Sequence, residues 1–398
     1  MVTFGCRLNG AESDLIRARA EAAGHHDLVV VNTCAVTSEA VRQGAQAVRR
    51  LRRERPGARL VVTGCAATVE PARFGLPGVA LVGNAGKLDV EAWAGAGTGL
   101  PRPGPSGAGD AVPATRGQVR SFVAVQNGCD HRCTFCTIPF GRGASRSVSV
   151  EAVVAEIRRR VEDGAREVVL TGVDLTAYTL DGAPGLGRLA KAILAEVPDL
   201  PRLRLSSIDG AEADPDLLDA LATEPRLMPH LHLSLQAGDD LVLKRMRRRH
   251  TRADAVRFCD RVRALRPDVV FGADLIAGFP TEDETMFGRS LDLVEACGLT
   301  YLHVFPFSAR PGTPAARMPQ VPGPVIAERA RRLRERGAAA LTAHLAAEVG
   351  RRRAVLVETE HLGRTAGFAP VRFRLPQRRG ALVETGIAGH DGRELLAA

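Results

Sequence analysis

The chain contains no apolar run that approaches the ~18 residues needed to span a membrane as a helix. Its N-terminus also has no basic segment followed by an apolar stretch, so no secretory signal peptide is expected. Hydrophobic residues make up 45% of the 398 residues and charged residues 25%, as in soluble globular proteins of two or three domains. We therefore expect a cytoplasmic protein with no membrane partner.

Lysine is scarce as well. The lysines are Lys87, Lys191 and Lys244, so arginine supplies almost all of the formal net charge of +9. An excess of positive charge favours a polyanionic partner such as nucleic acid, and a solvated basic surface is the alternative.

The first part of the chain, residues 1–93, alternates between strand and helix patterns. Short buried-strand runs occur at 2–4, 28–31, 60–62 and 80–82. Helical patterns occur at 13–23, with Ser13 as the expected N-cap, and at 37–54. This alternation predicts a small doubly wound α/β domain. Residues 94–117, rich in Gly, Pro, Ala and Ser, are expected to form a linker.

Residues 118–323 repeat a strand–helix unit. The expected strands are 122–125, 167–171, 203–206, 230–235, 269–275 and 301–305. The expected helices lie near 150–163, 186–196, 214–222, 252–265 and 284–296. Parallel strands that alternate with crossover helices close into a barrel, and six units predict a partial (β/α)6 barrel. Residues 324–350 are expected to form a connecting helix and residues 351–398 a small β-barrel.

Three of the eight cysteines form a C-x3-C-x2-C motif on one short loop, at Cys129, Cys133 and Cys136. Three thiolates can hold three corners of a [4Fe–4S] cube, and no fourth cysteine follows nearby to complete the set, so one iron would stay open to another ligand. A structural zinc site is the alternative, but it requires four tetrahedral ligands.

Three other cysteines are far apart in sequence, yet each follows a predicted strand of the first domain. They are Cys6, Cys34 and Cys65. Because the carboxyl ends of parallel strands meet at one edge, the three thiols should converge on a second cluster there. The alternative is three small buried residues. Cys259 and Cys297 lie on predicted helices among apolar neighbours and are expected in the core.

The combined motifs resemble the methylthiotransferase family of radical S-adenosylmethionine (SAM) enzymes. The segments 5–9, 32–34 and 64–65 resemble its N-terminal cluster domain, and 127–136 with Pro139, Arg142 and Arg146 resembles its radical SAM loop, in which Phe135 precedes the last cysteine. The C-terminal residues resemble its TRAM module, an RNA-binding, oligonucleotide-binding-like β-barrel. The resemblance covers nearly the whole chain, and its weakest parts are the linker and the last ~45 residues.

This resemblance implies a mechanism and its partners. Cys129, Cys133 and Cys136 would be the catalytic set, whose open iron chelates SAM so that one electron yields a 5′-deoxyadenosyl radical. It also implies two [4Fe–4S] clusters, two SAM per turnover and a tRNA substrate. A low-potential electron donor such as flavodoxin or ferredoxin and a sulfur source are implied too, and we expect a monomer.

Several stretches resemble the branch of the family that modifies threonylcarbamoyladenosine in tRNA. They are 32–37, 82–87, 205–208, 303–308 and 310–314. The other branches act on isopentenyladenosine in tRNA or on an aspartate of a small-subunit ribosomal protein, and both stay open as alternatives. A non-catalytic iron–sulfur protein that binds RNA or acts as a sensor is a further alternative.

Polar and flexible residues recur at the ends of successive predicted barrel strands, where ligands of such barrels bind. With Phe135, the expected SAM contacts are Thr171, Gly172, Ser206, Ser234, Gln236, Ile276 and Gly278. Gln236 is placed for the ribose and Ile276 for the adenine, and Asp274 is an expected structural cap.

The basic stretches 42–59, 244–249 and 329–336 are candidates for RNA binding, and so is the C-terminal module. The expected contacts in the module are Arg351, Arg352, Arg353, Arg372 and Arg374, which lack balancing acids nearby in sequence. Phe368 and Phe373 are its only aromatic residues, so we expect it to act mainly through charge rather than base stacking.

Overall fold

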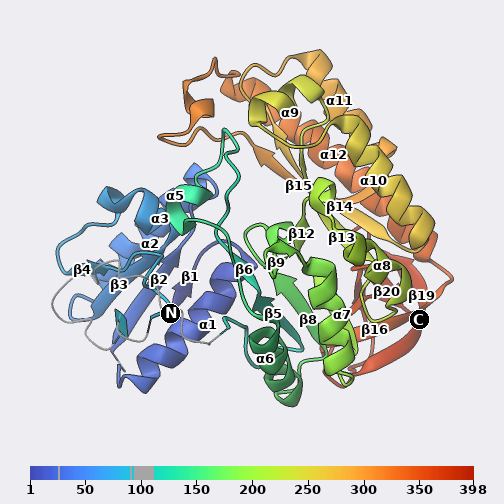
Figure 1. Cartoon of the computed structure of the whole chain (residues 1–398), viewed down its shortest axis with the longest axis horizontal. Coiled ribbons are helices and arrows are strands. Elements are labelled where there is room, and N and C mark those ends of the chain that lie inside the picture. Colours follow the sequence, from blue (N-terminus) through green and yellow to red (C-terminus); the bar gives the residue numbers. More distant parts are fainter. Residues whose placement is uncertain (26, 90–91, 94–111) are drawn as a thin grey trace.

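The computed structural model describes residues 1–25, 27–89, 92–93 and 112–398. Most of the expected linker, residues 94–111, lies outside the described residues. The overall class is α/β, with an N-terminal sheet, a central barrel and a small C-terminal barrel (Figure 1). In the part of the chain that the structure describes, no helix is long and apolar enough to cross a membrane.

The N-terminal sheet consists of four parallel strands in the order β1-β2-β3-β4. These are β1 (Val2–Thr3), β2 (Leu28–Thr33), β3 (Arg59–Gly64) and β4 (Val79–Leu81). Between them run α1 (Arg7–Ala22), α2 (Ser38–Glu54), α3 (Cys65–Val69) and the short η1 (Pro71–Arg73). Val31 and Val62 belong to the core that contains α2 residues, whereas Val30 and Val61 belong to the one that contains Ile16 of α1. Helices therefore cover both faces of the sheet, as the apolar strand runs predict.

The start of the first helix differs from the prediction. Helix α1 begins at Arg7, directly after Cys6, and Ser13 lies buried within it rather than at its N-cap. The Ser13 hydroxyl accepts hydrogen bonds from Thr3 Oγ1 at 2.8 Å and from Asn32 Nδ2 at 3.1 Å. Serine is common at N-caps because its hydroxyl can bond free backbone N–H groups, but here that hydroxyl bonds the neighbouring strands instead.

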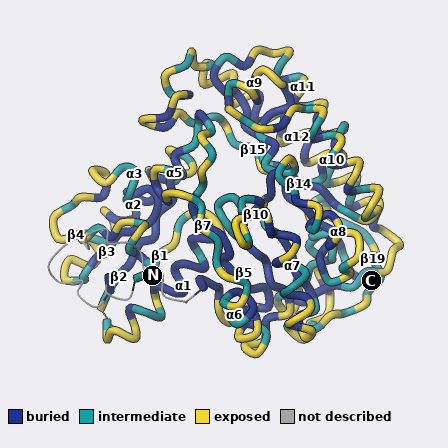
Figure 2. Tube along the Cα trace, in the orientation of Figure 1, coloured by how far each residue is buried: buried dark blue, intermediate teal, exposed yellow. Residues whose placement is uncertain are grey.

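The central barrel is partial, and its predicted strands and helices are confirmed to within two residues. One sheet contains β5 (Arg120–Ala124), β8 (Glu167–Thr171) and β11 (Arg202–Leu205), and the next contains β12 (Ser207–Ile208), β13 (His230–Gln236), β14 (Val270–Ala277) and β15 (Leu299–Pro306). The covering helices are α6 (Val150–Glu162), α7 (Leu186–Glu196), α8 (Pro215–Thr223), α9 (Asp240–Met246), α10 (Arg252–Leu265) and α11 (Glu284–Ala296). Figure 2 shows most of the barrel strands buried, β15 partly buried and the outer helical faces exposed.

Several short elements connect the barrel strands. They are β6 (Gln126–Asn127), α5 (Ile138–Arg142), β7 (Arg146–Ser147), η2 (Leu175–Ala177), β9 (Thr179–Leu180), β10 (Ala183–Pro184), η3 (Gly210–Glu212) and η4 (Pro314–Arg317). Helix α12 (Gly323–Glu348) then packs along β15. Cys259 and Cys297 are both fully buried in the barrel core, as their apolar neighbours predict.

The C-terminal residues form a closed barrel in the order β16-β17-β18-β20-β19. Its strands are β16 (Arg352–Thr359), β17 (Leu362–Thr365), β18 (Pro370–Arg372), β19 (Leu382–His390) and β20 (Leu395–Ala397). Arg202 of the central barrel donates to the backbone oxygens of Arg364 at 2.9 Å and Ala354 at 2.8 Å. The small barrel therefore covers the N-terminal end of the central strands.

Candidate functional site

The loop that carries Cys129, Cys133 and Cys136 leaves the barrel after β6 and returns through α5. Gly128 shapes its start with a φ of +78°, and a Cβ there would lie 1.9 Å from the Ala144 backbone oxygen. Only glycine tolerates that approach. The Cys129 N–H donates to the Gly143 backbone oxygen at 3.0 Å, so the two ends of the loop are held together.

Hydrogen-bond donors point at the sulfurs of this loop. The Ile138 N–H lies 3.4 Å from Cys136 Sγ, and the Arg248 guanidinium lies 3.6 Å from Cys133 Sγ. Burial raises the pKa of the Cys129 thiol to about 12 and that of Cys136 to about 11. A metal deprotonates coordinating thiols outright, and donors aimed at sulfur stabilise the resulting thiolates. The loop therefore fits an iron–sulfur cluster held by three cysteines.

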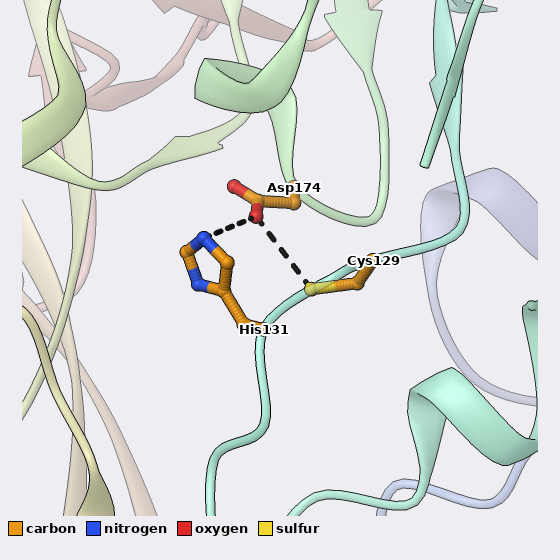
Figure 3. A group of neighbouring side chains, drawn as sticks. All are labelled: Cys129, His131 and Asp174. Atoms are coloured by element: carbon orange, nitrogen blue, oxygen red, sulfur yellow. Dashed lines mark hydrogen bonds and ion pairs between the residues drawn. The ribbon is translucent and has the colours of Figure 1, made fainter. Parts of the chain in front are cut away.

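His131 and Asp174 flank this loop. Figure 3 shows the Asp174 carboxylate between the His131 ring, at 3.3 Å, and Cys129 Sγ, at 3.6 Å. These three ligand atoms are close enough together to hold a metal ion. However, hydrogen bonds with Cys133 and Glu212 raise the pKa of His131 to about 10. A structural zinc site takes four ligands, whereas Cys129, His131 and Asp174 offer three.

The sheet edge brings Cys6, Cys34 and Cys65 together. Cys6 precedes α1, Cys34 follows β2 and Cys65 begins α3 directly after β3. Burial, together with the charges of Cys6 and Cys65, raises the pKa of Cys34 to about 11. A Cβ on Gly5 would lie 2.5 Å from Cys34 Sγ, so only glycine allows the strand to pass so close to this sulfur. This donor set also fits a cluster held by three thiolates.

Arg142, at the end of α5, joins the two cysteine sets. Its guanidinium lies 3.1 Å from Cys65 Sγ, 2.8 Å from Glu12 Oε1 and 2.7 Å from Asn9 Oδ1. Glu12 also contacts Lys87 at 2.5 Å, and all three charged side chains are buried. Although burial raises it, these two cations hold the pKa of Glu12 at about 2. Two buried cations against one carboxylate leave one positive charge, which an anionic Cys65 sulfur would balance.

A cavity of about 200 Å³ at the C-terminal ends of the barrel strands contains three of the expected SAM contacts. Phe135, Gln236 and Ile276 line it, together with Asp274 and Phe305. Gln236 has a φ of +70°, which is uncommon for a residue other than glycine. Such strained backbone conformations cluster at binding and active sites. Val36 and Thr37 of the N-terminal domain complete the wall, so this pocket lies between the domains.

The other expected SAM contacts lie elsewhere. Ser206 lines a deeper cavity, while Thr171, Gly172, Ser234 and Gly278 line neither of these two cavities. Gly278 donates its N–H to Glu282 at 2.8 Å, and the Ser234 backbone oxygen accepts from Arg248 at 2.7 Å. Arg248 itself was expected among RNA-binding residues, but it is buried and points at the cluster loop. Asp274, expected as a structural cap, instead contacts His232 and His303.

Three of the five expected C-terminal arginines have balancing acids, contrary to the sequence expectation. Arg351 and Arg353 contact Glu348 of α12, and Arg372 contacts Glu394. Glu394 lies 22 residues from Arg372 in the sequence, whereas Glu348 lies close to Arg351 and Arg353, at the end of α12. Arg352 and Arg374 are exposed and have no acidic partner among the residues that the structure describes.

Comparison with protein families matches two segments of the chain. Residues 123–294 match the radical SAM superfamily, and residues 1–76 match the family described as "Uncharacterized protein family UPF0004". Among solved structures, the radical SAM methyltransferase TsrM from Kitasatospora setae is similar, with a TM-score of 0.55 and 17% identity over 77% of this chain and 68% of that one. At that identity the likeness concerns the fold.

Curated relatives match over most of their length. Threonylcarbamoyladenosine tRNA methylthiotransferase MtaB of Rickettsia prowazekii is 44% identical over 94% of this chain and 90% of its own. The protein of the same name from Thermotoga maritima is 34% identical over 89% of this chain and 85% of its own. A tRNA-2-methylthio-N(6)-dimethylallyladenosine synthase of Cereibacter sphaeroides is 36% identical over 87% and 85%.

Proposed function

This chain belongs to the tRNA methylthiotransferase family of radical SAM enzymes, and from that premise we propose that it transfers a methylthio group to carbon 2 of threonylcarbamoyladenosine next to the anticodon. The observation that carries the choice of substrate is the 44% identity to the Rickettsia threonylcarbamoyladenosine enzyme over 94% of the chain. Relatives named for dimethylallyladenosine reach 36%. That nucleoside is therefore the second candidate.

Two clusters are part of the proposal. SAM and a [4Fe–4S] cluster belong to the radical SAM family, and Cys129, Cys133 and Cys136 are the proposed catalytic cluster ligands. Cys6, Cys34 and Cys65 are the proposed ligands of a second cluster. The donors aimed at sulfurs of both sets, from Arg248 and from Arg142, support this assignment.

The chemistry explains why two sites are useful. Carbon 2 of adenine carries a strong C–H bond without an acidic proton, so general-base catalysis by a side chain cannot activate it. A cluster held by Cys129, Cys133 and Cys136 would supply radical chemistry with SAM, and a second cluster held by Cys6, Cys34 and Cys65 would supply a place to hold the sulfur. The chain's own residues position these groups: Arg142 fixes the N-terminal cysteines against the loop, and Phe135, Gln236 and Ile276 line the pocket beside it.

The remaining roles are proposals on the same basis. The cluster domain would be residues 1–93, the catalytic barrel residues 118–323 and the RNA-binding TRAM-like module residues 351–398. A linker at 94–117 and a helix at 324–350 would join them. tRNA would be the substrate of a cytoplasmic monomer that receives electrons from a flavodoxin or ferredoxin and sulfur from a separate source. Two SAM would be consumed per turnover.

Nucleoside analysis of tRNA tests the substrate. tRNA from a strain that lacks the gene should lose 2-methylthio-threonylcarbamoyladenosine and regain it on complementation. Loss of the isopentenyl derivative instead would favour the second candidate. A change in mass of a ribosomal protein, with tRNA unchanged, would contradict both.

Iron analysis tests the two clusters separately. The reconstituted protein should hold about 8 iron, and replacement of either cysteine set by alanine should leave about 4. A Cys34→Ala variant should still release 5′-deoxyadenosine but form no methylthio-nucleoside. If that variant modifies tRNA normally, the N-terminal cysteines are structural only.

A further inference from the structure

A cavity of about 420 Å³ lies inside the central barrel, below the pocket that contains Gln236. Phe122 of β5 and Tyr301 of β15 face it from the two edge strands, which Figure 1 shows on opposite sides of the barrel. Arg7 of α1 and Arg334 of α12 line it as well. Its volume is typical of a small-molecule site.

The cavity meets the upper pocket at a layer of three side chains. Alternate residues of a strand face the same way, so β13 presents His230, His232 and Gln236 in ascending order, and β15 presents Tyr301, His303 and Phe305. Asp274 of β14 binds His232 at 2.9 Å and His303 at 3.2 Å. The histidines line the cavity and Asp274 lines the upper pocket, so a ligand in the cavity lies next to the proposed SAM site.

The lining of this cavity is cationic. Arg7, Arg120, Arg204 and Arg334 contribute to it, and no carboxylate does so among the residues that the structure describes. Arg120 and Arg204 both form ion pairs with Glu167, which does not itself line the cavity. Arg7 and Arg334 are exposed and have no acidic partner in the described part of the chain; Arg7 lies 4.7 Å over the Phe122 ring.

Two residues that line the cavity also carry buried polar groups without partners. His230 is only 5% exposed, yet neither of its ring nitrogens has a hydrogen bond. The Tyr301 hydroxyl is also buried without one. Burial keeps the pKa of His230 well below its usual value, so the ring is neutral and offers one donor and one acceptor. Buried polar groups normally have partners, and two such residues in one cavity point to a polar ligand.

The C-terminal barrel contributes an aromatic wall. Phe368 stacks on His230 with ring centroids 4.4 Å apart. Its φ of +80° is strained for a side chain of this size, and such strain often marks a residue held for binding. The ring also lies 5.4 Å and 5.2 Å from the guanidiniums of Arg120 and Arg204, which fix its orientation.

We propose that this cavity receives the threonylcarbamoyl group of the target nucleoside, with Arg7 and Arg334 binding its carboxylate, an inference that rests on the proposed function. The group carries one carboxylate, a hydroxyl and a urea, which match the arginines at the mouth and the unpartnered His230 and Tyr301 inside. An isopentenyl group would leave all these groups without partners. A site built for polar partners strongly rejects a ligand that lacks them.

Binding of anticodon stem-loops to the iron-loaded protein tests this assignment. The loops differ only at the target adenosine: unmodified, threonylcarbamoylated, or carrying the methyl ester of the threonyl carboxylate. We expect the wild type to bind the carboxylate form about 10- to 100-fold more tightly than the ester. Arg334→Gln and Arg7→Gln should each remove most of that preference and change binding of the unmodified loop by less than about 2-fold.

Arg331→Gln is the matched control, because Arg331 lies on the same helix but contacts Glu328 and Glu335 and does not line the cavity. Iron content verifies that Arg7→Gln, next to Cys6, retains its clusters. The wild-type comparison of acid and ester needs no variant, so a misfolded variant cannot hide the answer.

The outcomes separate the inference from the proposed function. Equal weakening for all three loops would show that the arginines bind backbone phosphate and would overturn the inference. A wild type that modifies threonylcarbamoyladenosine but does not distinguish acid from ester would overturn the inference and leave the function standing. A wild type that modifies only isopentenyladenosine would overturn both.

Discussion

Arg142 links the two cysteine sets, because it ends the helix that follows the cluster loop and its guanidinium contacts Cys65 of the N-terminal set. The guanidinium also donates to Asn127 next to that loop at 2.9 Å. Its other partners, Asn9, Glu12 and Cys65, belong to the N-terminal domain. A buried guanidinium with this many acceptors cannot be replaced by a neutral residue without leaving Glu12 and two asparagine oxygens short of donors. Hydrogen bonds to cluster sulfurs also shift reduction potential, so the residue influences both stability and redox chemistry.

Arg142→Met should therefore destabilise the protein by about 3–5 kcal/mol, because it breaks a buried ion-pair network by removing one partner. Thermal unfolding of the iron-free protein measures the effect apart from cluster loss. Arg158→Met is the control, because Arg158 and Glu196 form an exposed pair and its loss should leave the midpoint nearly unchanged. An Arg142→Met midpoint equal to that of the wild type would show that the network contributes nothing.

Helices α7 and α8 illustrate how closely the elements of the barrel pack. The Asp214 carboxylate accepts from the Leu217 N–H at 2.8 Å, which caps α8, and from the Gly187 N–H at 3.1 Å, which ties it to α7. Gly187 allows this approach, since a Cβ there would lie 2.0 Å from Leu217 N. The conflict is with backbone, which cannot swing away as a side chain can.

Gly187→Ala should lower stability by about 1–3 kcal/mol, as overpacking in a close-packed core does. Gly288→Ala, in α11, should act in the opposite direction and raise stability by about 0.5–1 kcal/mol, because its Cβ would meet nothing within 4 Å. Paired thermal melts measure both changes. A stabilising Gly187→Ala would mean that α7 and α8 can separate freely.

The periodic elements were predictable because burial imposes their patterns. The 167–171 strand matches β8, and the predicted helices of the barrel match within two residues. The hairpin at Thr179–Pro184 and the start of α1 were not predicted, since neither has an apolar period. The same limit applies to the sites: cysteine spacing reveals two sets, but His232, Asp274 and His303 meet only through strand register, which no local pattern encodes.

At the scale of the whole molecule, the C-terminal module is a structural neighbour of the catalytic barrel as well as a candidate RNA surface. Its basic residues divide into paired ones, such as Arg351, and exposed unpaired ones, Arg352 and Arg374. A deletion of the module would remove Phe368 and uncover Arg202, so it cannot isolate RNA binding. Point variants can.

Arg352→Gln combined with Arg374→Gln should weaken tRNA binding and flatten the slope of log affinity against log salt by about 0.7–0.9 for each lost phosphate contact. Arg372→Gln should change the slope less, because Glu394 already neutralises that arginine. Filter binding over a range of salt concentrations gives the slopes. Identical slopes for all three proteins would place the tRNA backbone on other surfaces.

The C-terminal barrel covers the N-terminal end of the central strands, and this arrangement has a consequence for the order in which the protein folds on the ribosome. Arg202 meets the backbone oxygen of Arg364 across a separation of 162 residues. At typical synthesis rates that interval lasts roughly 8–30 s, during which β13, β14 and β15 are made and the residues at the N-terminal end of the barrel have no cover. The nascent barrel would then expose Arg202, Arg204 and His230 to solvent or to chaperones. Completion of the catalytic chamber would thus coincide with the arrival of the last β-strands.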